Sequence, residues 1–292
     1  MRRRAAMTRE KRLAIEKIVS VFMLAYGINY FGYYFRNRFL RWLNGFHLDE
    51  GLFHVLFYMG HLIFLTVFII YALAVKGDRK YFLAPFRKCT SSNLLSILVG
   101  GVYGFSAMGI CIFAASFHGD IVITRLPQIN VPLIVFAVFA VFLQASIEEI
   151  ESRGFVFGKM YEEGVPLALA VLFSSLFFAF IHAANPGFGL VPFISIVVIG
   201  AQFALIYHYF GNIWFTCASH MMWNFTQDFI FGLPDSGNKA AVSIFDTKIN
   251  GSSFFYDATF GIEGSYMAIT VNALLCIAVI AVGRATQKKR AE

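Results

Sequence analysis

Charged residues are scarce in this chain. Only 14% of its 292 residues are Asp, Glu, Lys or Arg, while 58% are hydrophobic, and a soluble domain carries nearly twice that charged fraction. This balance argues against one water-soluble core and favours a chain whose surface mostly faces lipid. The net charge of +7 sits mostly in tails and loops, so it bears on membrane orientation rather than on nucleic-acid binding.

Cysteine and metal-binding patterns are scarce as well. The chain has four scattered cysteines and neither a CxxC pair nor an HExxH run: Cys89, Cys111, Cys217 and Cys276. A disulfide framework or a zinc knuckle is therefore not expected, and the sequence signal for catalytic zinc is weak.

Apolar runs are abundant, and a spanning helix needs about 20 mostly apolar residues. Eight segments qualify as candidate spans: 15–35, 52–75, 94–117, 131–150, 166–184, 190–210, 212–232 and 265–283. The sequence therefore predicts an all-α polytopic membrane bundle of about eight transmembrane helices.

Lys and Arg predict how the bundle is oriented. They gather in the N-terminal arm, after the second span and in the C-terminal tail: Arg2, Arg3, Arg4, Arg9, Lys11, Arg12, Lys17; Lys76, Arg79, Lys80, Arg87, Lys88; Arg284, Lys288, Lys289 and Arg290. An even number of spans places all three groups on one side, which the positive-inside rule makes cytoplasmic. Arg36, Arg38 and Arg41 disagree with this orientation, so we expect a short interfacial helix around them.

Charges inside spanning segments are costly, and the first cluster of them follows the run VPLIVFAVFAVFLQ. Glu149 and Arg153 are four residues apart, so they share a helix face and can pair. Glu148 points about 100° away, which leaves its carboxylate free to serve as a general base. The alternative is that the helix ends here and the charges are interfacial.

Two further clusters follow on later helices. His182 ends an apolar run, just before Asn185-Pro186-Gly187 breaks the helix. His220 and Asn224 lie four apart on one face, and both can donate hydrogen bonds without being charged. The alternative for His182 is an interfacial or hydrogen-bonded structural residue, and for His220 and Asn224 it is hydrogen bonding between helices.

The spacing of these residues favours a shared site. If the chain turns at Gly164, Glu148 lies 16 residues before the turn and His182 lies 18 after it. Antiparallel helices then bring both residues to nearly the same level. Sixteen helical residues reach about 24 Å, so the hairpin must protrude from the membrane or contain a kink, for which Gly154 and Gly158 are candidates.

Together the clusters read EExxxR, FxxxH and HxxxN on successive apolar helices: Glu148-Glu149-Ile-Glu-Ser-Arg153, Phe178-Ala-Phe-Ile-His182 and His220-Met-Met-Trp-Asn224. In this order they resemble the motifs of the CPBP family, the CAAX proteases and bacteriocin-processing enzymes also called Abi proteins. The resemblance covers 148–224. It implies an intramembrane endopeptidase that acts on a membrane-associated, prenylated or other peptide substrate.

The resemblance also implies roles for the motif residues. Glu148 would be the general base, with help from His182, while His220 and Asn224 would stabilise the oxyanion. Glu149 and Arg153 would form a structural pair, and Phe178 would pack near the site. No cofactor or metal is implied. The partners would be a peptide or lipidated protein substrate and membrane lipids, with no nucleic acid.

We therefore expect three regions. Residues 1–130 form a basic arm and three spans, residues 131–232 form the catalytic core in helices 4–7, and residues 233–292 form a polar loop, the last span and a basic tail. The loop 233–264 is the only long polar connection, which is typical of a functional or disordered segment. We expect a multi-pass protein of the bacterial cytoplasmic membrane with both termini cytoplasmic.

Three other functions stay open at the level of the residues. Glu148, His182 and His220 could bind zinc and leave a fourth position open, with Cys217 as a further ligand. Intramembrane ionisable residues also suit a proton-coupled transporter, although no inverted repeat is evident. A non-catalytic scaffold or immunity protein is the third. Outside the motifs, His54 and His61 are expected to be structural or interfacial.

Overall fold

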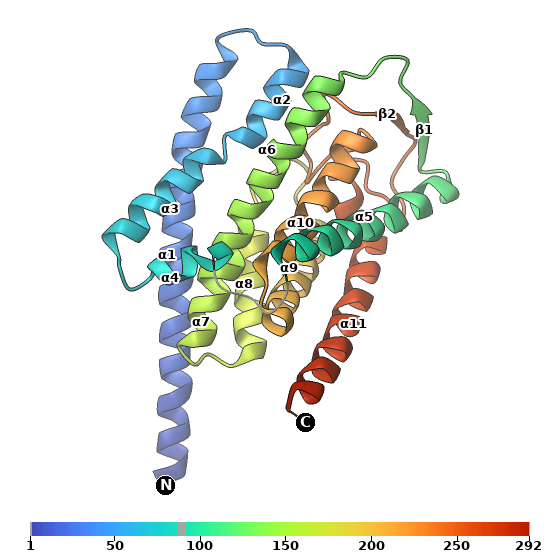
Figure 1. Cartoon of the computed structure of the whole chain (residues 1–292). Helices are drawn as coiled ribbons and strands as arrows, with labels where there is room; N and C mark the ends of the chain where they lie inside the picture. Colours follow the sequence, from blue (N-terminus) through green and yellow to red (C-terminus); the bar gives the residue numbers. More distant parts are fainter. Residues whose placement is uncertain (1, 87–91, 292) are drawn as a thin grey trace.

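The computed structural model describes residues 2–86 and 92–291. Arg87 and Lys88, which contribute to the predicted orientation, and Cys89 lie outside these residues. The helices bundle roughly along one axis, and α5 (Asn93–His118) crosses the bundle obliquely (Figure 1). This confirms the predicted all-α polytopic architecture.

The N-terminal third begins with one long helix, α1 (Arg2–Asn44). A broken span follows, made of α2 (Glu50–Met59) and α3 (Leu62–Ala74). Two short helices, α4 (Arg79–Phe82) and the 3-10 turn η1 (Ala84–Phe86), then lie beside the bundle. The predicted interfacial helix around Arg36, Arg38 and Arg41 is wrong, because no helix breaker interrupts α1 before Gly45 and the three arginines lie within it.

The central region contains all three motifs. Helix α6 (Val131–Glu149) continues through a π-helical stretch, η2 (Ile150–Phe157), into α7 (Gly158–Glu162). It is followed by α8 (Leu167–Ile181), α9 (Leu190–Phe210), α10 (Ile213–Phe225) and a second π-helical stretch, η3 (Thr226–Ile230). After the 3-10 turn η4 (Ile262–Gly264), the chain ends in α11 (Tyr266–Ala291).

Within the described residues, six helices are long and apolar enough to cross a membrane. The two other predicted spans are helical but shorter: α8 has 15 residues and α10 has 13. Helix α8 ends where His182 caps it before the Asn-Pro-Gly break. Helix α10 gives way to η3, where Gln227 and Asp228 are fully buried polar residues. The second and third motifs thus lie on helices shorter than a full span.

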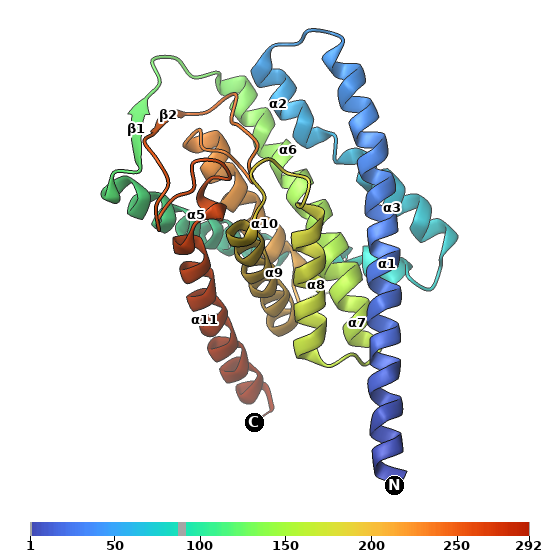
Figure 2. The same cartoon turned by 180° about the vertical axis from the view of Figure 1, so that it is seen from behind.

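Both termini lie at one end of the bundle, as an even number of passes requires (Figure 1; Figure 2 shows the same from behind). At the other end, β1 (Ile121–Arg125) pairs antiparallel with β2 (Phe245–Ile249), with Ile123 opposite Thr247. The strands join two segments that were expected to be loops. Their pairing places the start of the 118–130 connection against the middle of the long polar loop.

In the fourth span, residues 150–157 widen into a π-helix that includes Gly154, one of the two candidate kink sites. Such stretches are frequent at functional sites. A Cβ atom at Gly154 would lie 2.8 Å from the carbonyl oxygen of Tyr81, so this glycine lets α4 approach closely. The span of 32 residues reaches roughly 48 Å at about 1.5 Å per residue, well beyond a hydrocarbon core of about 30 Å.

Small residues hold α5 against α10. A side chain at Gly100 or Gly104 would overlap the backbone carbonyl of Phe215 or Ser219, respectively. The hydroxyl of Ser219 also donates a hydrogen bond to the carbonyl of Gly100 at 3.0 Å. Close backbone approach through small residues is how helices pack in lipid, where burial of apolar surface gives little drive. This contact fixes the helix that carries His220 and Asn224.

We expect Gly104→Ala to destabilise the protein by about 1–3 kcal/mol, because the new methyl group forces α5 away from α10. Gly109→Ala is the matched control, since nothing lies within 4 Å of a Cβ atom at Gly109 and alanine favours the helix. Thermal unfolding of both purified variants in the same detergent measures the effect. Equal midpoints for the two variants would contradict the close contact.

Candidate active site

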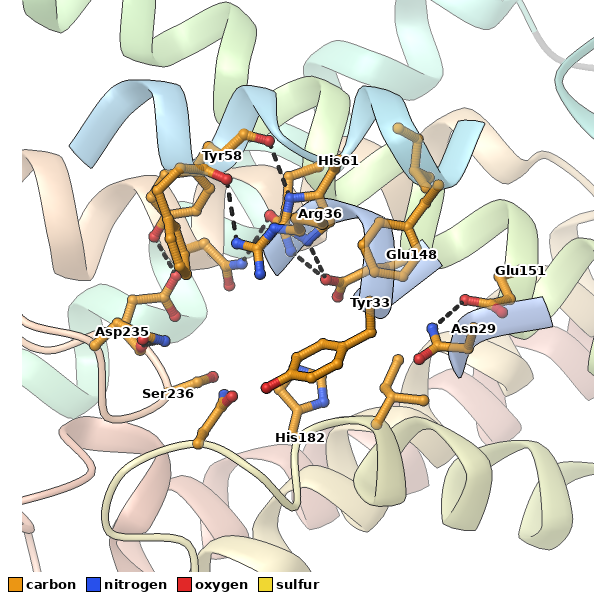
Figure 3. Close-up of a pocket in the computed structure, with 18 residues that line it drawn as sticks. Asn29, Tyr33, Arg36, Tyr58, His61, Glu148, Glu151, His182, Asp235 and Ser236 are labelled. Carbon is orange, nitrogen blue, oxygen red and sulfur yellow. Dashed lines mark hydrogen bonds and ion pairs between the residues drawn. The ribbon is translucent and has the colours of Figure 1, made fainter. Parts of the chain in front are cut away.

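One pocket gathers three of the four predicted catalytic residues, Glu148, His182 and Asn224, and has a volume of about 90 Å³, which is room for a few water molecules. Its walls come from α1, from the α2–α3 junction, from α6 and η2, from the end of α8 and from the loop after η3 (Figure 3). The polar and charged lining side chains are Asn29, Tyr33, Arg36, Tyr58, His61, Gln144, Glu148, Glu151, His182, Asn185, Asn224, Asp235, Ser236 and Asn238.

Glu148 lies on the pocket wall with its two carboxylate oxygens in different surroundings. Oε1 accepts a hydrogen bond from Nε2 of Gln144 at 2.7 Å and lies 3.5 Å from Nε2 of His61. Oε2 is buried, receives no hydrogen bond from the described residues and lies 3.9 Å from Nε2 of His220. One oxygen is therefore positioned by the protein, while the other keeps an unused capacity to accept a hydrogen bond.

Glu149 points the other way, into the protein. It is 0% exposed, and its Oε1 accepts hydrogen bonds from Nη1 of Arg153 at 2.8 Å and from Nδ1 of His220 at 3.0 Å. The guanidinium of Arg153 also donates to the carbonyl of Gly200 and lies over the ring of Phe178, 4.4 Å from its centre. Four residues from three motifs are thus joined behind the pocket.

His182 lies at the C-terminal end of α8 and lines the pocket with Glu148. Its Nδ1 is 2.8 Å from the carbonyl of Phe178 and donates to it, because a carbonyl can only accept. In the neutral ring, Nε2 is then the acceptor nitrogen. The hairpin thus brings Glu148 and His182 to one pocket, at a separation beyond the 4.0 Å of an ion pair.

Asn224 follows His220 on the same face of α10 and also lines the pocket. Its Nδ2 donates to Oε1 of Gln144 at 3.3 Å, and Gln144 in turn donates to Glu148. His220 itself stays behind the wall, between the rings of Phe178 and Phe203. Gln144 therefore links α10, the helix with the HxxxN motif, to the carboxylate of Glu148. It was not predicted from the sequence.

Pocket residues on the first two spans were not predicted from the sequence. His61 was expected to be structural or interfacial, yet it lies beside Glu148. Arg36 was expected on a short interfacial helix, yet it is only 7% exposed. His54 contacts a different carboxylate, Asp228, at 2.7 Å. The usable signal was the cost of ionisable side chains within apolar segments, which holds for His61 and Arg36 as for the motif residues.

A second acidic cluster borders the pocket. The hydroxyl of Tyr58 lies 2.7 Å from Oδ2 of Asp228 and 2.6 Å from Oδ2 of Asp235. A single hydroxyl can donate only one hydrogen bond. The second hydrogen bond therefore requires a protonated carboxyl group that donates to the oxygen of Tyr58. Burial, followed by the charges of Glu263 and Asp228, raises the pKa of Asp235 well above its usual value. Asp235 is therefore the group that holds the proton.

A metal ion would need several ligand atoms converging on one point. In the ranges 2–86 and 92–291, no three His, Cys, Asp or Glu side chains gather in a way that could hold one. Nδ1 of His220 contacts Glu149, Nδ1 of His182 contacts a backbone carbonyl, and Cys217 is fully buried in the apolar core. These contacts leave Nε2 of both histidines available as a ligand. The described residues hold no assembled three-ligand group, and the alternative zinc set stays a prediction.

Fold and site together define an integral multi-pass membrane protein with a carboxylate–histidine pocket. Residues 130–226 match the family model described as type II CAAX prenyl endopeptidase Rce1-like, a segment that includes all three motifs. The resemblance to the CPBP family is thereby confirmed for this segment, and at the level of the family it supports a CAAX-type intramembrane protease. No curated protein matches the chain.

The raised pKa of Asp235 gives a signed pH prediction. The folded state binds this proton more tightly than the unfolded state, whose carboxyl titrates near 3.8, so stability falls as pH rises above about 4. The amide of an Asp235→Asn variant cannot titrate and keeps a donor for Tyr58. We expect the thermal midpoint of this variant to fall less than that of wild type between pH 5 and pH 9. Each kcal/mol of difference in unfolding free energy corresponds to roughly 2–4 °C in the midpoint.

The matched control is Asp246→Asn, which removes an exposed carboxylate on β2. Its midpoint should follow the wild-type pH dependence. If Asp235→Asn followed that same dependence, Asp235 would not hold the proton.

Proposed function

We propose that the chain is an intramembrane endopeptidase in which Glu148 activates water to hydrolyse a peptide bond of a membrane-associated peptide or lipidated protein. The observation that carries the proposal is the position of Glu148: one oxygen is held by Gln144, and the other is buried at a pocket with room for water. The family match of residues 130–226 supports the protease class.

In this proposal the carboxylate of Glu148 accepts a hydrogen bond from the water and takes its proton as the water attacks the carbonyl carbon. A positioned general base contributes typically about 10²–10⁴-fold. His61 and His182 line the same pocket, and either ring can take the proton from Glu148 and pass it to the leaving amine. The polar lining keeps the carboxylate ionised, which a purely apolar wall would oppose.

The oxyanion requires hydrogen-bond donors, for which His220 and Asn224 are the candidates. Nδ1 of His220 faces a carboxylate, which accepts only, so Nδ1 carries a hydrogen. Nε2 lies 3.9 Å from Oε2 of Glu148, and Asn224 lines the pocket with an amide group that can donate. A preorganised donor of this kind contributes typically about 10²–10³-fold.

Glu149 and Arg153 are positioning residues in this proposal, because both are fully buried and neither lines the pocket. Their pair fixes the tautomer and orientation of His220, as a partner on the far side of a histidine ring does in other sites. Phe178 packs against Arg153, His182 and His220, so it holds three of these groups together.

We expect Glu148→Gln to lower the rate of peptide hydrolysis by at least about 10²-fold, because the amide cannot take a proton from water. The matched control is Glu151→Gln. Glu151 lies on the same wall, but its Oε2 accepts a hydrogen bond from Asn29 at 3.0 Å, and a glutamine oxygen can replace it. Hydrolysis of a prenylated CAAX-type peptide by purified protein, followed by mass spectrometry, measures both variants. Wild-type turnover by Glu148→Gln would rule out this residue as the base.

We infer further that hydrolysis does not depend on a metal ion, since the histidines and carboxylates of the pocket do not converge on one point. Purified protein treated with a strong zinc chelator and then dialysed should keep its activity within about twofold. Loss of activity that zinc restores would instead favour the metal-dependent alternative with Glu148, His182 and His220 as ligands.

A further inference from the structure

Arg36 is a buried cation without an ionic partner. It is 7% exposed, its Nη2 donates to the carbonyl of Phe57 at 3.1 Å, and its guanidinium lies 4.0 Å from the centre of the Phe57 ring. Neither contact neutralises its charge. No carboxylate of the described residues lies within 4.0 Å of it, and its Nε has no hydrogen-bond partner among them. A buried unpaired charge is strongly destabilising, so its presence calls for an anion.

The surroundings hold this guanidinium at the pocket that contains Glu148. Arg36 reaches it from α1, beside His61 (Figure 3). Close packing of α1 against the α2–α3 junction depends on glycines: a Cβ atom at Gly60 would lie 3.4 Å from Nε of Arg36, and one at Gly32 would overlap the ring of Phe64. The chain thus leaves room for the guanidinium at this point.

Glu148 forms no ion pair with Arg36. Its charge acts on Arg36 from beyond 4.0 Å, while its close contacts are with Gln144, His61 and His220. Both groups nevertheless line one pocket. Arg36 donates to the carbonyl of Phe57 near the end of α2, and His61, at the break between α2 and α3, contacts Glu148. An anion at Arg36 would therefore lie close to a group that reacts at Glu148.

We propose that Arg36 binds the free C-terminal carboxylate of the peptide substrate, an inference that rests on the proposed peptidase function. A guanidinium matches a carboxylate with two parallel hydrogen bonds, and Arg is the residue suited to such planar anions at buried sites. A buried cation in the pocket wall suits a chain end, because an internal residue of a peptide has no backbone carboxylate to offer.

Three prenylated peptides test this subsite. Two of them share one sequence and end in a free carboxylate or in an amide. The third has Asp as its last residue and also ends in an amide, so its only carboxylate there is the side chain. Binding to Glu148→Gln protein in zwitterionic nanodiscs is measured by titration calorimetry, and hydrolysis by wild type is measured in parallel. We expect the free acid to bind at least about tenfold more tightly than either amide, with the preference appearing in KM rather than in kcat.

Variants assign the preference to Arg36. Arg36→Met keeps about the same side-chain volume. It should bind all three peptides as weakly as the protein with Arg36 binds the amide. Arg36→Lys should keep part of the preference for the free acid. The matched control is Arg38→Met: Arg38 is exposed on the same helix and reaches only Tyr34, so its removal should leave the preference unchanged. Thermal midpoints verify that each variant folds.

The outcomes separate the subsite from the proposed function. Equal binding of acid and amide by Glu148→Gln protein overturns the subsite, and so does tight binding of the Asp amide. An equal loss of kcat on acid and amide in Arg36→Met, with KM unchanged, would assign Arg36 to the oxyanion instead and also overturns it. If the acid preference is present but no peptide is cleaved, the subsite holds and the peptidase function fails.

Discussion

The buried carboxylate of Glu149 is the interaction on which the site depends. It accepts hydrogen bonds from Arg153, one turn along its own helix, and from His220 on α10, although all three groups lie among apolar helices. Removing one partner would leave a charge without compensation, at a cost of about 3–5 kcal/mol. The arrangement therefore fixes the register between α6 and α10, and it turns Glu148, the adjacent residue, towards the pocket.

The π-helical stretch η2 lies directly after this pair and has a related role. An extra residue in a turn displaces every later side chain around the helix axis. Arg153 lies within this stretch, as does Gly154, which lets Tyr81 approach. The span stays continuous over 32 residues while its polar residues are redistributed around the axis. A long span and a buried ionic centre are in this way compatible within one continuous helix.

The pocket has two halves of different origin. Residues 130–226, which match the Rce1-like family model, supply Glu148, His182 and Asn224. Outside the match, α1 supplies Arg36, and the loop after η3 supplies Asp235. We infer that the first half serves the chemistry and that the second half governs which peptide end is admitted. The acidic cluster around Tyr58 and Asp228 connects this second half to the helix that carries His220.

The sequence by itself determined the membrane class, the positions of the apolar helices and the pairing of Glu149 with Arg153, because periodicity and i,i+4 spacing are local properties. It also placed Glu148 and His182 at one level of a hairpin. Only the tertiary structure decided that His61 and Arg36 share their pocket, that a π-helix replaces the expected kink, and that β1 pairs with β2. These depend on how helices distant in sequence pack together, which no local pattern encodes.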